Sequence, residues 1–458
     1  TDGGKAYTTL EASPEYPKKR DIVEYQAKTG ERSILVSASR LIPAGSNQPL
    51  DIHDYHWSNN KEILKIYTNS KRVWRDNTRG DYWILDMESG NLKQLGKDFP
   101  ESSLMFAKFS PDDTRVGYVS EHNIYVEDIK SGTVTAITTD GTVDLINGTF
   151  DWAYEEEFGI QDGFRWSPDG TKIAYWQLDA SEIRDFLMIN NTDSIYSYTV
   201  PVQYPKVGED PSSCRVGVVS ASGGNTTWIP VPGDSKQHYL PRIMWSPDSK
   251  LVLLQQIPRK QNTNRIWAYK VADRSVENIY TDQDEAWVRA IDDWIWLNKG
   301  KEFSFISEKT GWKHFYRVSV DGSADQAVTQ GEFDVVSIVL IDDDNGYVYF
   351  IASPDNPTQR YLYRTKLNGS GKPQRLSPDD QPGDHSYQIA PGGKYAFHTY
   401  STANTPPVID LVALPSHKTI RTLAANEKYI SHLNSLDKND IKFFNITTET
   451  GVDMEGYM

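Results

Sequence analysis

Three consecutive glutamates are the residues of this sequence best suited to chemistry. They stand in the segment Asp151-Trp-Ala-Tyr-Glu-Glu-Glu-Phe158, between two expected strands. In a strand, neighbouring side chains point to opposite faces, whereas a helical turn separates them by about 100° and lets two adjacent glutamates converge. Asp151 is a preferred residue type for the position that begins such a helix. The motif therefore predicts a short helix, capped by Asp151, that presents a pair of carboxylates.

A pair of neighbouring carboxylates should bind a cation. Each carboxylate raises the pKa of the other unless a positive charge lies between them. An ammonium group fits, because it has three donors for two or three acceptors, and the free amino terminus of a peptide is mostly protonated at neutral pH. The residues alone leave a second interpretation open, in which the segment is a solvated acidic turn without a ligand.

The sequence lacks the patterns that mark other common chemistries. It contains no Gly-x-Ser-x-Gly, no His-Glu-x-x-His, no Gly-x-x-x-x-Gly-Lys-Ser/Thr and no Cys-x-x-Cys. His53 and His56 are the closest pair of histidines, and we interpret them as surface residues rather than as a metal site. We therefore predict neither a metal nor a cofactor.

Charge and hydropathy exclude several classes of partner. The sequence has 48 Lys and Arg residues and 63 Asp and Glu residues, which gives a net charge of -15. This charge disfavours binding to nucleic acid and to anionic membrane surfaces. A mostly aliphatic run, Val335 to Ile341 with Ser337 inside it, is far shorter than the roughly 20 residues that cross a bilayer. A single cysteine, Cys214, excludes an internal disulfide.

The elements that must position the glutamates come from a repeat. Aromatic residues make up 12% of the sequence and occur in short alternating runs separated by turn residues, which is typical of an all-β fold. An aromatic or aliphatic residue followed by Ser-Pro-Asp or a similar turn recurs, mostly every 44 to 57 residues with one interval of 79, and predicts a hairpin in each copy. This spacing indicates an eight-bladed β-propeller, with seven blades as the fallback. The copies begin at Trp57, Phe109, Trp166, Trp245, Leu297, Ile341 and Ile389.

Two further expectations concern the domain as a whole. We treat residues 1–458 as a single propeller domain and expect the segments Asp21 to Ala38 and Asp440 to Thr447 to pair as a composite blade that closes the ring. The long interval, Gln177 to Met244, predicts an excursion from the ring. Its apolar run, Phe186 to Ile189, should be buried against some surface.

Three motifs in the same order resemble a known family. They are the segment 151–158, then Phe164-Arg-Trp-Ser-Pro-Asp-Gly-Thr-Lys-Ile-Ala-Tyr-Trp176, then Tyr204-Pro-Lys-Val-Gly-Glu209. Together they look like the N-terminal propeller of the dipeptidyl peptidase IV family of serine peptidases. The likeness runs from Trp57 to the end of the chain. It implies an eight-bladed propeller that caps an α/β-hydrolase domain expected after Met458, so that no catalytic Ser, Asp or His lies in this chain.

The resemblance also implies a role for three residues. Glu156 and Glu157 would hold the amino terminus of the substrate. Arg75, in the segment Arg72-Val-Trp-Arg75, would contact a substrate carbonyl and steady the acidic pair, with Arg79 as its competitor in a different register. A clamp at a fixed distance from a nucleophile would make two residues, about 7 Å of extended chain, the length that reaches the scissile bond.

The same resemblance implies partners and a location. The expected partners are peptides with a free N-terminus, the hydrolase domain of the same polypeptide, and a second copy of the chain that is contacted partly through the excursion. We expect a secreted or periplasmic protein whose signal peptide lies outside this sequence. The single cysteine favours a bacterial origin over a disulfide-rich animal relative.

Three alternatives remain open on the sequence alone. A related peptidase with tripeptidyl or acylaminoacyl preference would use a different clamp. A propeller that serves only as a protein-interaction platform would keep the acidic segment as a surface turn. An inactive relative would share the fold without the activity.

Overall fold

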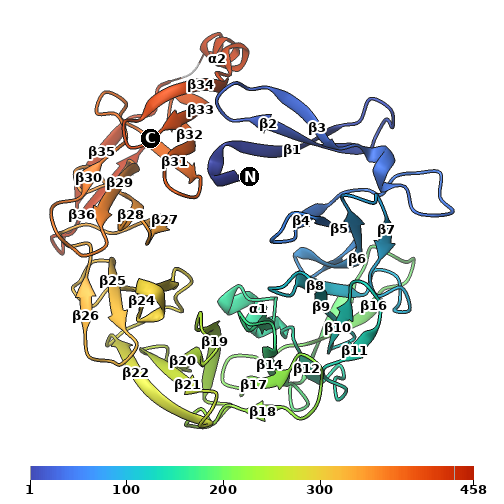
Figure 1. Ribbon diagram of the computed structural model, residues 1–458. Coiled ribbons are helices and arrows are strands. Elements are labelled where there is room, and N and C mark those ends of the chain that lie inside the picture. Colours follow the sequence, from blue (N-terminus) through green and yellow to red (C-terminus); the bar gives the residue numbers. More distant parts are fainter. Residues whose placement is uncertain (1, 438) are drawn as a thin grey trace.

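A computed structural model describes residues 2–437 and 439–458, and in this part of the chain eight β-sheet blades follow one another around a ring (Figure 1). The predicted all-β, eight-bladed propeller is confirmed. Most blades contain four antiparallel strands, whereas the first has three. Neither described α-helix has the length and apolar composition of a membrane span.

The first four blades run from the N-terminus to the middle of the chain. Blades 2 and 3 share one continuous sheet because β6 pairs with β8. Their strands are, for blade 1, β1 (Ala6–Ala12), β2 (Arg20–Gln26) and β3 (Arg32–Val36); for blade 2, β4 (Asp54–Trp57), β5 (Ile63–Val73), β6 (Asp76–Asp86) and β7 (Leu92–Gln94); for blade 3, β8 (Leu104–Phe109), β9 (Arg115–Ser120), β10 (Asn123–Asp128) and β11 (Val134–Ala136); and for blade 4, β12 (Leu145–Asn147), β13 (Phe164–Trp166), β14 (Lys172–Asp179), β17 (Ser213–Ser220) and β18 (Thr227–Trp228).

The last four blades are regular four-stranded sheets. Their strands are, for blade 5, β19 (His238–Trp245), β20 (Leu251–Pro258), β21 (Thr263–Lys270) and β22 (Ser275–Gln283); for blade 6, β23 (Trp296–Leu297), β24 (Glu302–Ser307), β25 (His314–Ser319) and β26 (Asp325–Ala327); for blade 7, β27 (Ser337–Asp342), β28 (Tyr347–Ala352), β29 (Tyr361–Lys366) and β30 (Gln374–Arg375); and for blade 8, β31 (Asp384–Ile389), β32 (Tyr395–Thr402), β33 (Thr405–Ala413) and β34 (Lys418–Ala424).

A few elements lie outside the blades. Among the described residues they comprise two hairpins, two α-helices and three short 3-10 helices. Their bounds are β15 (Asp185–Asn190), β16 (Tyr198–Gln203), β35 (Phe443–Thr447), β36 (Asp453–Tyr457), α1 (Trp152–Phe158), α2 (Glu427–Asn434), η1 (Asp2–Gly4), η2 (Ala38–Leu41) and η3 (Asn298–Gly300).

The recurring turn motif builds the first hairpin of blades 2 to 8. In blade 4, the Ser167 Oγ donates to Asp169 Oδ1 at 2.6 Å and accepts the N–H of Lys172 at 2.9 Å. Gly170 has a φ of +68°, in the left-handed region that a glycine adopts without strain. The hydroxyl thus ties the turn to the start of the second strand. The hairpins predicted from the motif are confirmed.

The blades pack through apolar faces, with polar links at the seams. The side chain of Trp176 in β14 is fully buried, and its indole N–H donates to Leu240 O of blade 5 at 2.7 Å. Because both faces of such central strands are covered by neighbouring blades, their sequences are apolar on both sides. The core is therefore a ring of interfaces between sheets.

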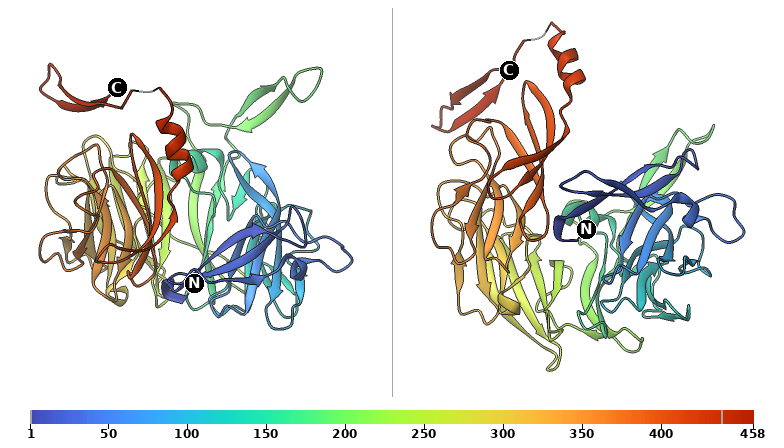
Figure 2. Two further views of the ribbon diagram at one scale, coloured as in Figure 1. Left: turned by 90° about the horizontal axis from the view of Figure 1, so that it is seen from above. Right: turned by 45° about the horizontal axis from the view of Figure 1, so that its top comes forward.

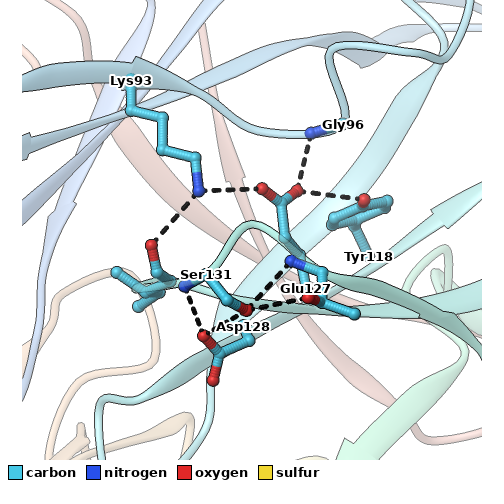
Figure 3. A network of polar contacts seen from close by, with 8 residues as sticks. Lys93, Gly96, Tyr118, Glu127, Asp128 and Ser131 are labelled. Carbon is cyan, nitrogen blue, oxygen red and sulfur yellow. Dashed lines mark hydrogen bonds and ion pairs between the residues drawn. The ribbon is translucent and has the colours of Figure 1, made fainter.

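One seam contains a buried carboxylate. Glu127 of β10, only 3% exposed, accepts hydrogen bonds from Gly96 N at 2.8 Å and from the Tyr118 hydroxyl at 3.2 Å (Figure 3). Lys93 of β7 places its Nζ 3.4 Å from the other carboxylate oxygen. A buried charge with this many partners stabilises the contact between blades 2 and 3, whereas an unpaired one would destabilise it.

The ring closes differently from the prediction. The expected pairing of Asp21–Ala38 with Asp440–Thr447 is wrong, because β2 pairs with β1 and β3 while β35 pairs with β36. Blade 1 instead meets blade 8 through side chains. Tyr7 lies edge-on to Phe397 at 5.0 Å, and Arg421 Nη2 donates to the Tyr7 hydroxyl at 2.9 Å. The N-terminal segment has its own third strand, β1, and α2 leads the C-terminal hairpin away from the ring (Figure 2).

The excursion is a hairpin that leaves blade 4 between β14 and β17. Its strands, β15 and β16, pair with each other, and Figure 2 shows the hairpin projecting from the same face of the ring as β35 and β36. Val202 of β16 is buried, but the apolar run Phe186 to Ile189 is exposed on the chain itself, so its expected burial would need a surface from outside this fold. Leu187 is 58% exposed and Ile189 is 68% exposed. The surface that would cover them is not part of this chain's own described fold.

Candidate functional site

The acidic motif forms α1, on the inner side of the ring (Figure 1). Asp151 caps the helix as predicted, because its Oδ1 accepts the N–H of Tyr154 at 3.0 Å. Its other oxygen accepts from the Ser212 hydroxyl at 2.6 Å. Burial raises the pKa of Asp151. Gly159, with a φ of +59°, ends the helix in the left-handed conformation and donates its N–H to Glu155 O at 3.1 Å.

The opposite face of α1 fixes the helix in the wall of the ring. Tyr154 is fully buried, and its hydroxyl accepts the N–H of Leu240 in blade 5 at 3.2 Å. Its ring stacks on Phe150 with centroids 5.6 Å apart, and Phe158, one turn further along the helix, is 7% exposed. Since α1 is anchored on this side, the backbone that carries the glutamates has a defined position.

Glu155 belongs to a hydrogen-bonded network rather than to an open site. Its Oε1 accepts from Gln161 Nε2 at 2.9 Å, and the same amide nitrogen donates to Asp76 Oδ2 at 2.8 Å. Burial raises the pKa of Glu155, and the nearby negative charges of Asp76 and Glu156 raise it further. Gln161 thereby links α1 to the beginning of β6 in blade 2.

Glu156, on the helix within blade 4, forms an ion pair with Arg75 of blade 2. Arg75 Nη2 lies 2.8 Å from Glu156 Oε1, although 81 positions separate the residues in sequence. Arg75 is one of the two residues at the tip of the hairpin between β5 and β6, and its neighbour Trp74 has a φ of +52° that tightens this turn. The side chains of Arg75 and Glu156 are 73% and 30% exposed. At such exposure the pair contributes about 1 kcal/mol or less to stability, so its main consequence is the position of the carboxylate.

Glu157 follows on the helix and is exposed. Within residues 2–437 and 439–458, its carboxylate has neither a hydrogen bond nor an ion pair. The structure thus brings Glu156 and Arg75 together and leaves Glu157, the next residue of α1, exposed and without a partner among the described residues. Arg79, the competitor of Arg75, lies within β6 opposite Lys71 and forms neither a hydrogen bond nor an ion pair with the three glutamates.

An apolar groove adjoins this ion pair. It has a volume of about 820 Å³ and extends from the tip of the β5–β6 hairpin past α1 to the excursion hairpin. Trp152 of α1 lies on Tyr204 with ring centroids 4.4 Å apart. Sequence reasoning missed both aromatic residues as site residues, together with Gln161 and Asp76. Trp152 and Tyr204 lie in two of the motifs that carry the family resemblance, but no local pattern indicates that these four residues lie near one another or near the ion pair.

The fold defines an eight-bladed β-propeller, and comparison with known families places it in one of them. The family model described as "Dipeptidyl peptidase IV (DPP IV) N-terminal region" matches residues 58–407. Because that match covers most of the chain, the chain belongs to this family.

Individual relatives agree with the family assignment. Dipeptidyl peptidase 4 of Arthroderma otae is 26% identical over 432 residues, which cover 92% of this chain and 55% of the relative. Probable dipeptidyl peptidase 4 of Neosartorya fischeri is 25% identical over 447 residues, with 93% and 57% covered. The chain therefore spans a little more than half the length of these relatives.

Two solved structures share the fold. The crystal structure of Porphyromonas gingivalis dipeptidyl peptidase 4 superposes with a TM-score of 0.88 at 24% identity, over 99% of this chain and 64% of that one. A putative dipeptidyl aminopeptidase IV from Bacteroides ovatus gives a TM-score of 0.76 at 18% identity, over 99% and 63%. At these identities the likeness establishes the architecture.

Proposed function

We propose that this chain is the substrate-recognition and gating propeller of a serine exopeptidase that removes dipeptides from peptide N-termini. Membership of the family and the names of its relatives support a peptidase of this type. The observation that carries the proposal is the ion pair between Arg75 and Glu156, which fixes one carboxylate next to the open carboxylate of Glu157.

In this proposal, Glu156 and Glu157 accept the N–H donors of the substrate's terminal ammonium. Arg75 offsets one of the two negative charges, so that the three side chains carry a net charge of −1 and the bound ammonium neutralises it. Arg75 uses Nη2 for Glu156, and its remaining donors are available for a substrate carbonyl. A peptide with an acylated terminus lacks the positive charge and binds poorly.

The propeller selects and the hydrolase domain cleaves. The nucleophile, its histidine and its acid lie in the domain expected beyond this chain, at a fixed distance from the clamp. Holding the amino end of the peptide places the bond after the second residue at the nucleophile. Because part of the clamp's binding energy orients the reacting carbonyl, loss of the clamp should lower kcat as well as raise KM.

The test uses single variants of the full-length protein. Glu156→Gln and Glu157→Gln should each lower kcat/KM for a chromogenic dipeptidyl substrate by about 100-fold, the effect of losing a charged hydrogen bond to the substrate. Glu88→Gln, an equally conservative change at an exposed turn, is the matched control and should leave activity unchanged. If the clamp variants behaved like Glu88→Gln, the chain would be an interaction platform or a relative with another specificity.

Two further parts of the proposal concern assembly and location. The exposed apolar residues of the excursion hairpin, such as Leu187 and Ile189, support a homodimer contact there. Sedimentation of the full-length protein with Leu187→Glu, compared with the unchanged protein, tests it. Export to the periplasm or the exterior stays a prediction, which cell fractionation tests.

A further inference from the structure

The groove beside Arg75 has an apolar lining that is open to solvent. Trp74 is 43% exposed and Phe186 is 45% exposed. Tyr204 connects the two sides of the groove, because its ring centroid lies 4.4 Å from that of Trp152 and 6.0 Å from that of Phe186. Aromatic rings gathered in an exposed concavity of about 820 Å³ indicate a binding surface rather than incidental exposure.

The charges of the groove all have one sign. Among the residues that the structure describes, its only charged lining residues are Arg75 and Lys206, in a chain whose net charge is -15. Lys206 Nζ lies 5.2 Å from the centroid of the Phe186 ring, and no described carboxylate comes within 4 Å of it. Arg75 pairs with Glu156 through Nη2 alone among the described residues. Both cations therefore have donors that are open to a further anion.

We propose that this groove binds an amphipathic anion, and specifically a free monocarboxylate with an acyl chain of medium length. The carboxylate lies between Arg75 and Lys206, and the chain lies on the rings of Trp152, Tyr204 and Phe186. Such a ligand covers the apolar surface and also accepts hydrogen bonds from the unused donors of Arg75 and Lys206. A cationic or purely polar ligand would do at most one of the two.

This ligand is distinct from the peptide terminus of the proposed function, although the two sites share Arg75. A carboxylate in the groove competes with Glu156 for the guanidinium. Binding at the groove and the Arg75–Glu156 ion pair are therefore coupled, and each weakens the other to the same degree. Glu156→Gln removes the competing carboxylate and should therefore increase the affinity of the groove.

The experiment is calorimetric titration of the full-length protein with dodecanoate, below its micelle concentration and without substrate. We expect one site per chain. Dodecyltrimethylammonium, with the same chain and the opposite charge, should bind about tenfold more weakly or worse, and butyrate, with the same head and little chain, should not bind measurably. Equal affinity for the cationic amphiphile, or many weak sites, would mean non-specific adsorption and would overturn the proposal.

Two variants locate the site. Lys206→Glu changes an exposed residue without a carboxylate partner among the described residues, so it should fold normally and weaken dodecanoate binding about tenfold or more. Lys130→Glu, the same change at an exposed position outside the groove, should not alter it. Trp152→Ala should also weaken binding, with Trp287→Ala, at an exposed tryptophan outside the groove, as its control. Trp152→Ala could also destabilise α1, and Lys206→Glu tests the site without that risk.

Other outcomes have defined meanings. If Lys206→Glu bound dodecanoate with unchanged affinity, the ligand would not lie at the proposed site. The unchanged protein could instead fail to bind dodecanoate and form a dimer that Lys206→Glu dissociates. This result would show that a second copy covers the groove, and it too would overturn the proposal. Because no substrate is present, the result does not depend on whether the glutamate clamp operates.

Discussion

Two glutamates in this propeller pair with a cation from blade 2, and they differ in how many of their acceptor sites are filled. Glu127 is buried and bonded to a lysine, a backbone N–H and a tyrosine hydroxyl (Figure 3). Glu156 has one partner among the described residues, Arg75, and its side chain is 30% exposed. A buried carboxylate with three partners holds blades together. A carboxylate held by a single contact at the inner wall of the ring keeps acceptors for a ligand.

The largest expected effect comes from substituting Glu127, the buried carboxylate with three partners. Glu127→Ala leaves the Tyr118 hydroxyl and the N–H of Gly96 buried without a partner and removes the counter-charge of Lys93. We expect a loss of about 3 kcal/mol in the free energy of unfolding, measured with urea. Glu156→Gln in the same assay should lose less than about 1 kcal/mol. Equal losses would remove the distinction between the two sites.

A buried histidine, His398, should make the stability of the folded protein depend on pH. Burial, together with His417 and His385, lowers the pKa of His398 to about 3. Below pH 6.5 the unfolded chain therefore binds more protons at this residue than the folded one, and stability falls as the pH decreases toward 3. We expect about 3 kcal/mol less stability at pH 4 than at pH 7 from this residue.

Thermal unfolding across pH, with His398→Gln beside the unchanged protein, measures this effect. The variant should depend less on pH between 4 and 7, because it removes the buried imidazole and its 2.8 Å contact with His385. A variant that loses stability with acid as steeply as the unchanged protein would assign the effect to other residues.

A third prediction concerns the support of the open site. Asp151→Ala removes the N-cap of α1 and the partner of the Ser212 hydroxyl. We expect about 1 to 2 kcal/mol of destabilisation and a lower kcat/KM in the full-length protein, because the start of the helix that carries the glutamates is loosened. Glu11→Ala, which removes an ion pair with Arg32 in blade 1, is a control for activity. Unchanged activity with lowered stability would show that the cap does not position the site.

The smallest expected change in stability is at Arg75. Arg75→Ala should alter the free energy of unfolding by less than about 0.5 kcal/mol, because the ion pair is exposed. Its activity should fall nonetheless, and Arg75→Lys should restore it only in part, since lysine lacks the planar fork of donors. A large loss of stability in Arg75→Ala would mean that the β5–β6 hairpin depends on this contact for folding.

Features formed by residues close in sequence could be predicted, whereas contacts between residues far apart in sequence could not. The hairpin motif at Trp166 and the cap of Asp151 are local, and the sequence predicts both. The contact of Arg75 with Glu156 spans 81 positions, and only the family resemblance points to Arg75. No short-range pattern announces the bridge from Gln161 to Asp76, so it was missed.

The error in ring closure has a similar cause. Alternating apolar residues predict strands, but they do not identify the partner of each strand. The prediction that Asp440–Thr447 joins blade 1 is wrong for this reason, since β1 already fills that position and β36 pairs with β35. The groove beside Arg75 could not be predicted either, because its walls come from three separate parts of the chain.

The central claim is that Glu156 and Glu157 recognise a free amino terminus. Its most direct test is the ratio of kcat/KM for a dipeptidyl substrate to that for its N-acetyl derivative, measured on the full-length protein and on the double variant Glu156→Gln/Glu157→Gln. The account predicts a strong preference for the free amine in the unchanged protein and a ratio near one in the variant. A preference of the same size in both proteins would contradict it.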